Sequence, residues 1–153
     1  MDDVVIVAAG RTAVGKLNGT LKDIPATTLG ATLIKELMQK IKLERFEVDE
    51  VILGQVLTAG AGQNPARQTA IEAKLNITTP AYTVNKVCGS GLKAIELGVN
   101  EILLGNANVV IAGGQENMDL APHVLPGSRK GKRLGDWKLL DSMIKDGLFD
   151  AFN

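Results

Sequence analysis

The sequence has few of the residues that crosslink chains or bind metals, with one cysteine and one histidine among its 153 residues. A single cysteine excludes an internal disulfide. Without paired Cys or His residues at ligand spacing, there is also no metal cluster to propose. We therefore expect a reducing compartment.

An excess of charge of either sign is also absent, because 17 Lys and Arg residues balance 17 Asp and Glu residues. No overall field favours nucleic acid or an anionic membrane surface, so we expect neither as a partner. No apolar run reaches membrane-spanning length, and the start Met1-Asp2-Asp3 lacks the basic region of a signal peptide. These absences predict a cytoplasmic location.

Short apolar runs alternate with helical patterns along most of the chain. The hydrophobic content of 45% with 22% charged residues is ordinary for a soluble globular protein with a sizeable core. The alternation predicts an α/β fold of the βαβαβαβ type, a mainly parallel sheet with helices on both faces. We expect strands at residues 3–9, 50–57, 81–84 and 107–112, helices at residues 27–42, 65–75 and 90–104, and a last short helix at residues 137–145.

Two of these helices carry specific signals. Asn64 can cap a helix that begins with Pro65, whose missing N–H would be unpaired there in any case. The helix at residues 90–104 is apolar around most of its circumference, which predicts that it is mostly buried.

The only cysteine, Cys88, lies in the stretch Asn85-Lys86-Val87-Cys88-Gly89-Ser90-Gly91, where a strand pattern turns into a helix pattern. A thiol at a helix N-terminus is favoured as the nucleophilic thiolate, and the glycines allow a sharp turn and close approach of an acyl group. Most lone cysteines in such chains are only small buried hydrophobes, and a similar turn could serve only to pack a helix on a sheet. On the residues alone, both interpretations stay open.

Other stretches carry weaker signals. The spacing of Gly10 and Gly15 does not fit a dinucleotide fingerprint. The basic run Arg129-Lys130-Gly131-Lys132-Arg133 could bind phosphates or be solvated surface. Arg67 and Gln68 could support a subunit contact or only occupy the first turn of a helix.

The stretch at Cys88 closely resembles the thiolase family, in particular its short-chain acetyl-CoA acetyltransferases. Four further stretches agree in order along the chain: VIVAAGRT at residues 5–12, GAGQNPARQ at 60–68, AGGQENM at 112–118, and APH with LPGSR at 121–129. The likeness runs from end to end, although the chain is less than half the length usual in the family.

The resemblance implies a fold of two similar halves, with residues 1–118 forming the first core half and residues 119–153 the start of an inserted loop domain. It implies that Cys88 takes an acetyl group from acetyl-CoA and that its backbone N–H is an oxyanion donor. A second acetyl-CoA then attacks to give acetoacetyl-CoA, with coenzyme A as a substrate and no permanently bound cofactor. The coenzyme A contacts stay unassigned.

In the family, the activating histidine, a second cysteine and most of the coenzyme A pocket lie past the end of this sequence. His123 matches a family position that is not the base, and we expect a polar loop residue there. The implied partners are acetyl-CoA, a C-terminal half or second chain, and a further copy in an oligomer. The alternatives are a ketoacyl synthase-like enzyme and a non-catalytic binding or assembly half. Without a companion half, we expect an apolar strip of the helix at residues 90–104 to face water.

Overall fold

The structure, a computed structural model, describes residues 3–152. Met1 and Asp2 of the expected core half and Asn153 of the expected loop domain lie outside the described residues. Its centre is a parallel sheet of three strands in the order β2-β1-β3. The strands are β1 (Glu50–Gly54), β2 (Ala81–Val84) and β3 (Val110–Gly114). In this register Gly54 lies beside both Val84 and Gly114, so the carboxyl ends of all three strands are level.

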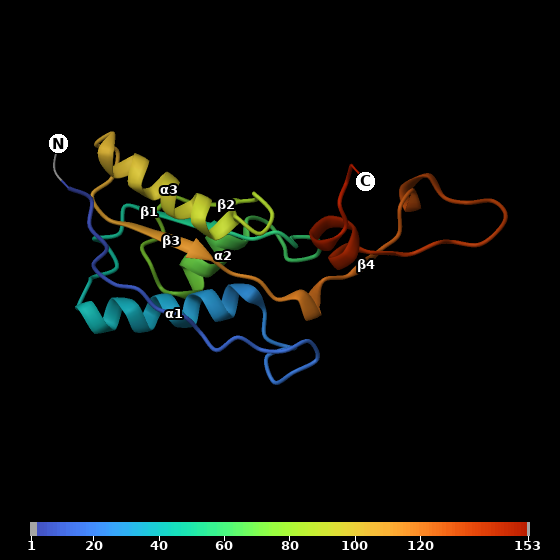
Figure 1. The fold of residues 1–153 in the computed structure, drawn as a ribbon, viewed down its shortest axis with the longest axis horizontal. Helices are drawn as coiled ribbons and strands as arrows, with labels where there is room; N and C mark the ends of the chain where they lie inside the picture. Colours follow the sequence, from blue (N-terminus) through green and yellow to red (C-terminus); the bar gives the residue numbers. More distant parts are fainter. Residues whose placement is uncertain (1–2, 153) are drawn as a thin grey trace.

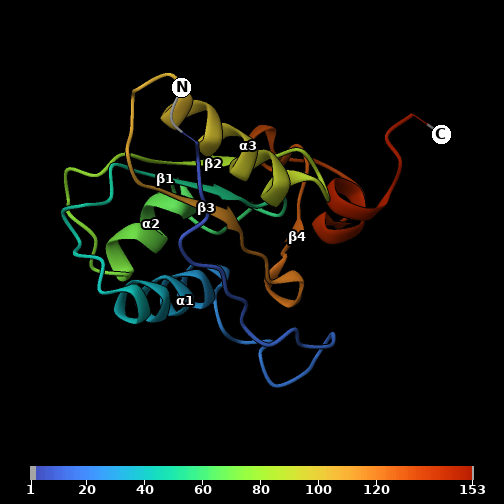
Figure 2. The ribbon, with the colours of Figure 1, turned by 60° about the vertical axis from the view of Figure 1, so that its left-hand side comes forward.

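Three helices cover the two faces of this sheet. α3 (Ser90–Leu103) lies on one face, and α2 (Pro65–Glu72) lies on the other, with α1 (Ala26–Ile41) packed against α2 (Figures 1 and 2). The prediction of a mainly parallel sheet with helices on both faces is therefore confirmed.

The main core lies between the sheet and the α1–α2 layer. Val51 and Leu53 lie two residues apart in β1, so both side chains are on the same face of the strand and pack against this layer. The helices meet them with small or branched side chains that let the layers approach closely: Ala31, Ile34, Ala66, Ala70 and Ala73. Ile52, on the opposite face of β1, is also fully buried.

The predicted start of α2 is confirmed in detail. Asn64 is the N-cap, its side-chain oxygen accepts the Arg67 N–H at 3.3 Å, and Pro65 occupies the first helical position. Asn64 has a φ of 44° and donates its side-chain N–H to the Ala81 carbonyl at 2.8 Å. The cap thereby ties the helix start to β2.

The predicted strand at residues 3–9 is wrong. The segment has no strand partner, and Val5, Ile6 and Val7 are largely exposed, with Ile6 at 81%. An apolar run of this kind becomes a strand only when a neighbouring strand offers free backbone groups in register. In the described chain, β3 pairs with β1 alone, and residues 3–9 run as a segment outside the sheet (Figure 2).

The predicted strands at residues 50–57 and 107–112 have wrong bounds at three ends. β3 runs on to Gly114 because Gly113 and Gly114 pair with Leu53 and Gly54 of β1. At the other two ends, carboxylates take the backbone N–H groups. Asp49 accepts the N–H groups of Asn108 and Val109 at 2.7 and 3.0 Å, so β3 begins only at Val110. Glu116 accepts the N–H groups that follow β1, which ends at Gly54 rather than at residue 57. α1, α2 and α3 start and end within three residues of the predicted positions.

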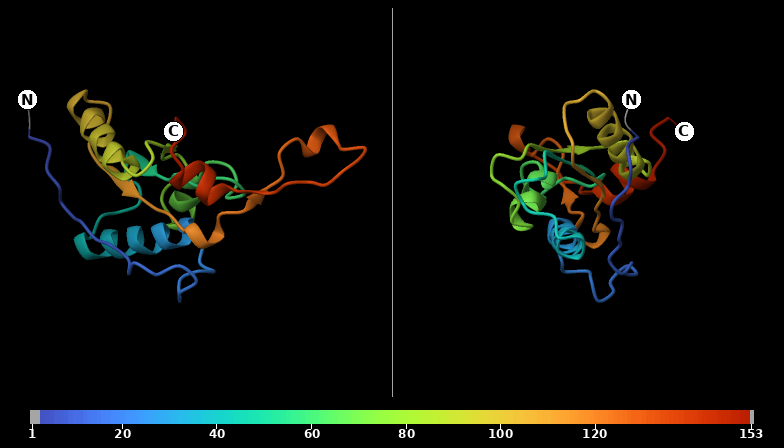
Figure 3. Two further views of the ribbon diagram at one scale, coloured as in Figure 1. Left: turned by 45° about the vertical axis from the view of Figure 1, so that its right-hand side comes forward. Right: turned by 90° about the vertical axis from the view of Figure 1, so that its left-hand side faces the viewer.

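Between β4 (His123–Val124) and β5 (Leu140–Asp141), which form a short antiparallel pair, the chain makes an arm that extends away from the core (Figure 3). This arm carries the short helix η2 (Ser128–Lys130). The short helix η1 (Met118–Leu120) precedes the arm, and the π-helix η3 (Met143–Leu148) follows it. The predicted helix at residues 137–145 is wrong in position, because pairing with β4 keeps residues 140–141 extended. The helix then starts after Asp141, whose side chain accepts the Met143 N–H at 2.9 Å.

The prediction that the third helix is mostly buried is wrong for this chain. Only Ser90, Ala94 and Gly98 of α3 are buried, whereas Leu92 is 76% exposed, next to the partly exposed Ile95. The face away from the sheet is therefore an uncovered apolar strip. Within residues 3–152, no helix combines the length and apolarity that crossing a bilayer requires.

Candidate functional site

The loops at the carboxyl ends of the three parallel strands meet at one edge of the sheet. Gln55 follows β1, Asn85 follows β2, and Gln115 follows β3. In open α/β sheets this edge is where ligands bind, because the strand-to-helix turns and helix N-termini gather there. Cys88 lies in one of these turns, between β2 and α3.

Cys88 is a free, exposed cysteine two residues before the first residue of α3. Gly89 is the N-cap of the helix and uses no side chain to cap it. The predicted position of the thiol at a helix start is therefore confirmed, and the alternative of a buried hydrophobe is wrong for this chain. Its role as a nucleophile stays a prediction.

The sharp turn before Cys88 does not use its glycines in the expected way. Val87 has a φ of 48°, whereas Gly89 has an ordinary φ of −87°. A β-branched residue with positive φ is a true outlier, and such strain persists only where surrounding contacts impose it.

Several hydrogen bonds hold this turn. Ser90 Oγ accepts the Lys86 N–H at 2.8 Å and donates to the Val87 carbonyl at 2.6 Å. Asn85 Oδ1 accepts the Val87 N–H at 2.9 Å. Backbone bonds from Gly89 to the Lys86 carbonyl and from Ser90 to the Val87 carbonyl close the turn at 3.1 and 3.0 Å. The strained residue is thus bonded through both its N–H and its carbonyl.

The start of α3 lies directly against the ends of β1 and β3. A Cβ atom on Gly54 would lie 2.4 Å from the Ser90 carbonyl carbon and 2.7 Å from the Gly91 nitrogen. Gly114 likewise approaches Gly91, since a Cβ atom there would lie 3.3 Å from the Gly91 Cα. Strand glycines therefore let the helix that follows Cys88 reach the sheet.

A buried chain of polar side chains joins the layers beneath the site. The Thr69 hydroxyl donates to Gln115 Oε1 at 2.8 Å, and Gln115 Nε2 donates to Gln55 Oε1 at 3.0 Å. Gln55 Nε2 then donates to the Leu57 carbonyl at 3.1 Å. The chain links α2, β3 and the segment after β1, and its paired groups keep these buried amides satisfied.

Glu116, beside this chain, is a half-buried carboxylate that sequence reasoning gave no role. It accepts the Val56 N–H at 2.8 Å and the Leu57 N–H at 3.3 Å. Burial raises the pKa of Glu116 above the ordinary 4.5, and these two N–H bonds oppose that rise. Its position just after a predicted strand could have indicated a site residue, because the carboxyl ends of parallel strands lie at the same edge of the sheet as Cys88. Glu116 also lines a cavity of about 260 Å³ with Arg11, Thr12, Gly30, Leu33 and Gln115.

The expectation of a loop residue at His123 is wrong: the structure places it in β4, with Nε2 3.9 Å from Asp141 Oδ2. The side chain is largely exposed, and the pair is an ion pair only when the imidazole is protonated. Asp141 on the neighbouring strand is therefore its ionic partner.

Arg67 and Gln68 both hold loops of their own chain. Arg67 donates through its two terminal nitrogens to the carbonyls of Thr79 and Ile77, each at 2.6 Å. Gln68 Nε2 donates to the carbonyls of Ala61 and Gln63 at 2.8 and 2.9 Å. These contacts add a structural role that neither interpretation of the sequence included.

The basic run lies in the arm, around η2. Lys132 donates to the Asp136 carbonyl and lies 6.0 Å from the centroid of the Trp137 ring. Lys132 and Trp137 line a surface hollow of about 490 Å³, together with Pro126, Gly127, Lys130, Lys138 and Leu140. In the described part of the chain, His, Cys, Asp and Glu side chains nowhere gather in threes as metal ligands would.

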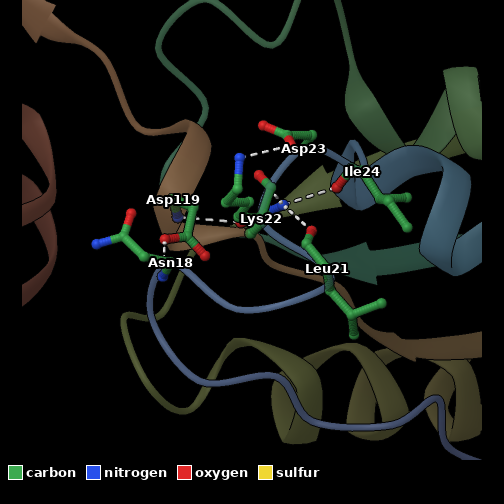
Figure 4. A network of polar contacts seen from close by, with 7 residues as sticks. Asn18, Leu21, Lys22, Asp23, Ile24 and Asp119 are labelled. Atoms are coloured by element: carbon green, nitrogen blue, oxygen red, sulfur yellow. Dashed lines mark hydrogen bonds and ion pairs between the residues drawn. The ribbon is translucent and has the colours of Figure 1, made fainter.

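A second polar network ties the N-terminal loop to the segment after β3. Asn117 donates its side-chain N–H groups to the carbonyls of Leu21 and Ile24 at 3.1 and 2.7 Å. Asp119 accepts the Asn18 N–H at 2.6 Å, next to the ion pair between Lys22 and Asp23 (Figure 4). Residues far apart in the chain thus meet beside the carboxyl edge of the sheet.

Comparison with known proteins gives one consistent result. Residues 4–153 match the family described as thiolase, N-terminal domain. The chain is 63% identical over 153 residues to an acetyl-CoA acetyltransferase of Pseudomonas aeruginosa, and 61% identical over 153 residues to one of Cupriavidus necator. It is 56% identical over 153 residues to a probable acetyl-CoA acetyltransferase of Escherichia coli. Each alignment covers all of this chain but only 39% of the length of the relative.

Proposed function

The chain belongs to the thiolase family, and from this premise we propose that it carries the nucleophilic part of an acyl-transferring enzyme, with Cys88 as the nucleophile. The observation that carries the proposal is the exposed free thiol at the start of α3, held in a strained turn at the carboxyl edge of the sheet. Its surroundings fit attack on a thioester, because helix N-termini favour negative charge and the glycine-rich turn leaves room for an acyl group.

In the proposed reaction, the Cys88 thiolate attacks the carbonyl carbon of acetyl-CoA, and the coenzyme A thiolate leaves. The product is an acetyl thioester on Cys88. A second acetyl-CoA loses a proton from its methyl carbon to a base, and the resulting carbanion attacks the thioester. The carbon–carbon bond forms, the Cys88 thiolate leaves, and acetoacetyl-CoA is released. The Cys88 backbone N–H is the proposed donor to the oxyanion of the first step.

The reaction needs one base to deprotonate Cys88 and another to deprotonate the methyl carbon. In our proposal, residues 3–152 supply neither base at the turn. His123 is in β4, beside Asp141. We therefore propose that both bases come from a companion half, whether this half is continuous with the chain or a separate one. The proposed division of the chain is a core half at residues 1–118 and the beginning of a loop domain at residues 119–153.

The further properties of the whole protein are part of the same proposal. Coenzyme A thioesters are the substrates, no cofactor is permanently bound, and the complete protein is a homo-oligomer. A free thiol persists most readily in a reducing compartment, which supports a cytoplasmic location. The names of the relatives support a thiolase rather than a ketoacyl synthase.

The test is to assemble the chain with a complementary second half, add acetyl-CoA and follow the peptide that contains Cys88 by mass spectrometry. We expect one acetyl group on Cys88 in the parent. In Cys88→Ser we expect no productive transfer together with an unchanged far-UV circular dichroism spectrum. Turnover by Cys88→Ser comparable to the parent would refute the assignment.

A second measurement uses the chain alone. We expect free coenzyme A release to be feeble, because the one histidine of residues 3–152 is paired with Asp141 of β5, while iodoacetamide still alkylates the exposed thiol. Robust synthesis of acetoacetyl-CoA by the chain alone would contradict the proposed need for a companion half. Absence of acetyl-Cys88 even in the assembled protein would favour the alternative of a non-catalytic assembly half.

A further inference from the structure

The turn that carries Cys88 contains a conformation that its own residues do not favour. Val87 has a φ of 48°, and a β-branched side chain in the left-handed region is strained. Left to itself, this residue would return to negative φ and move Cys88, the next residue, relative to the start of α3. The bonds of Ser90 and Asn85 hold it within the turn, and one of these residues, Asn85, also bonds to another strand end.

Asn85 stabilises the strained Val87 and connects it to the end of another strand. Its Oδ1 accepts the Val87 N–H at 2.9 Å, while its Nδ2 donates to the Val56 carbonyl in a long bond of 3.4 Å. The side chain thus spans from the turn after β2 to the segment after β1.

Glu116 fixes that segment in turn. Its Oε2 accepts the N–H groups of Val56 and Leu57 at 2.8 and 3.4 Å, and its Oε1 lies 3.3 Å from the Leu57 nitrogen. Bonds from backbone N–H groups to a carboxylate are stronger than neutral ones, and this carboxylate is half-buried. The amide plane that presents the Val56 carbonyl to Asn85 contains the Leu57 nitrogen, and the Val56 nitrogen lies just across the Val56 Cα from it. Both nitrogens are bonded to Glu116, so the carbonyl is fixed from both sides.

We propose that Asn85 and Glu116 are positioning residues for Cys88: Glu116 fixes the segment at residues 55–57, and Asn85 connects this segment to the strained Val87, which keeps the thiol at the N-terminus of α3. The inference rests on the proposed role of Cys88 as the nucleophile. It assigns no contact with substrate to either residue.

The test measures the rate at which iodoacetamide alkylates Cys88 in the complete native polypeptide, with peptide mass spectrometry to isolate the signal of this cysteine. We expect Asn85→Ala and Glu116→Ala to slow alkylation about two- to fivefold, the size of one charge–dipole interaction at a helix end. We expect Glu116→Gln to restore the rate, because a single amide oxygen in the place of Oε2 can accept both N–H groups.

The chain offers matched controls. Asn76 makes the same kind of bond to the residue two ahead, since its Oδ1 accepts the Thr78 N–H at 3.2 Å. Asp49 accepts two consecutive backbone N–H groups, as Glu116 does, but at the amino end of the sheet. We expect Asn76→Ala and Asp49→Ala to leave the Cys88 alkylation rate unchanged. Equal slowing in these controls would mean a general loss of stability and overturn the inference.

A second measurement examines the strain itself. Glycine adopts positive φ without penalty, so in a Val87→Gly background the turn needs less support. We expect Asn85→Ala to slow Cys88 alkylation by a smaller factor in the Val87→Gly background than in the background that keeps Val87. In the background that keeps Val87, we expect Asn85→Ala to speed hydrogen exchange at the Val87 amide. The same factor in both backgrounds would refute the connection through Val87. Neither readout requires acetyl transfer, so failure of the proposed function, seen as no acetyl-Cys88, is distinguishable from failure of this inference.

Discussion

Gly54→Ala should be among the most damaging single-methyl changes in the chain, because the added Cβ would collide with backbone atoms. The nearest are the Ser90 carbonyl carbon at 2.4 Å and the Gly91 nitrogen at 2.7 Å. A real Cβ atom stays at least 3.0 Å from such a neighbour, so β1 and α3 must separate by 3.0 − 2.4 = 0.6 Å or more. No side-chain rotation can provide this space.

The magnitude follows from what the separation disturbs. α3 packs along both β1 and β3, and moving its first turn weakens those contacts and the polar bonds around Cys88. Overpacking a tight interior costs about 1–3 kcal/mol, and a backbone collision belongs at the upper end of that range. About 3 kcal/mol is a large part of a typical net stability of 5–15 kcal/mol.

Gly113→Ala is the matched control. Gly113 lies in β3, opposite Leu53, and a Cβ atom there would have nothing within 4 Å. We expect this variant to have the parent's stability or to gain a few tenths of a kcal/mol, because alanine loses less backbone entropy on folding.

The assay is urea unfolding of the chain followed by far-UV circular dichroism. With a slope of about 2 kcal/mol per molar urea, a 3 kcal/mol loss lowers the midpoint by about 1.5 M. A midpoint for Gly54→Ala equal to that for Gly113→Ala would refute the argument that α3 rests directly on the end of β1.

Three further predictions concern other parts of the molecule. Arg67→Met should lower the free energy of unfolding by about 1–2 kcal/mol in urea titration, because two loop carbonyls lose a charged donor; no loss would mean that solvent replaces both bonds. Because burial raises the pKa of Glu116, the parent should lose stability relative to Glu116→Gln as the pH rises above the ordinary pKa of 4.5; parallel unfolding profiles would contradict this sign. The chain alone should self-associate, as measured by sedimentation velocity, or bind a hydrophobic dye, because the apolar strip of α3 is exposed. Leu92→Glu or an added second half should suppress both. A monodisperse parent that binds no dye would mean that the strip needs no partner.

Local sequence patterns predicted the parts of this protein that depend on neighbouring residues. Asn64-Pro65 predicted the start of α2, since capping is decided by neighbouring residues. The alternation of apolar runs and helical patterns predicted the parallel sheet with helices on both faces. The turn from strand to helix placed Cys88 at a helix start before any tertiary contact was known.

Features that need a partner from elsewhere in the chain could not be predicted in this way. Residues 3–9 have the composition of a strand but lack a neighbour to pair with, and β1 and β3 take their bounds from Glu116 and Asp49. The positive φ at Val87 was also hidden, because nothing in a valine predicts a left-handed conformation. In the structure Val87 is bonded to Asn85 and Ser90, and Asn85 also donates to the Val56 carbonyl after β1, which requires the strands to be side by side.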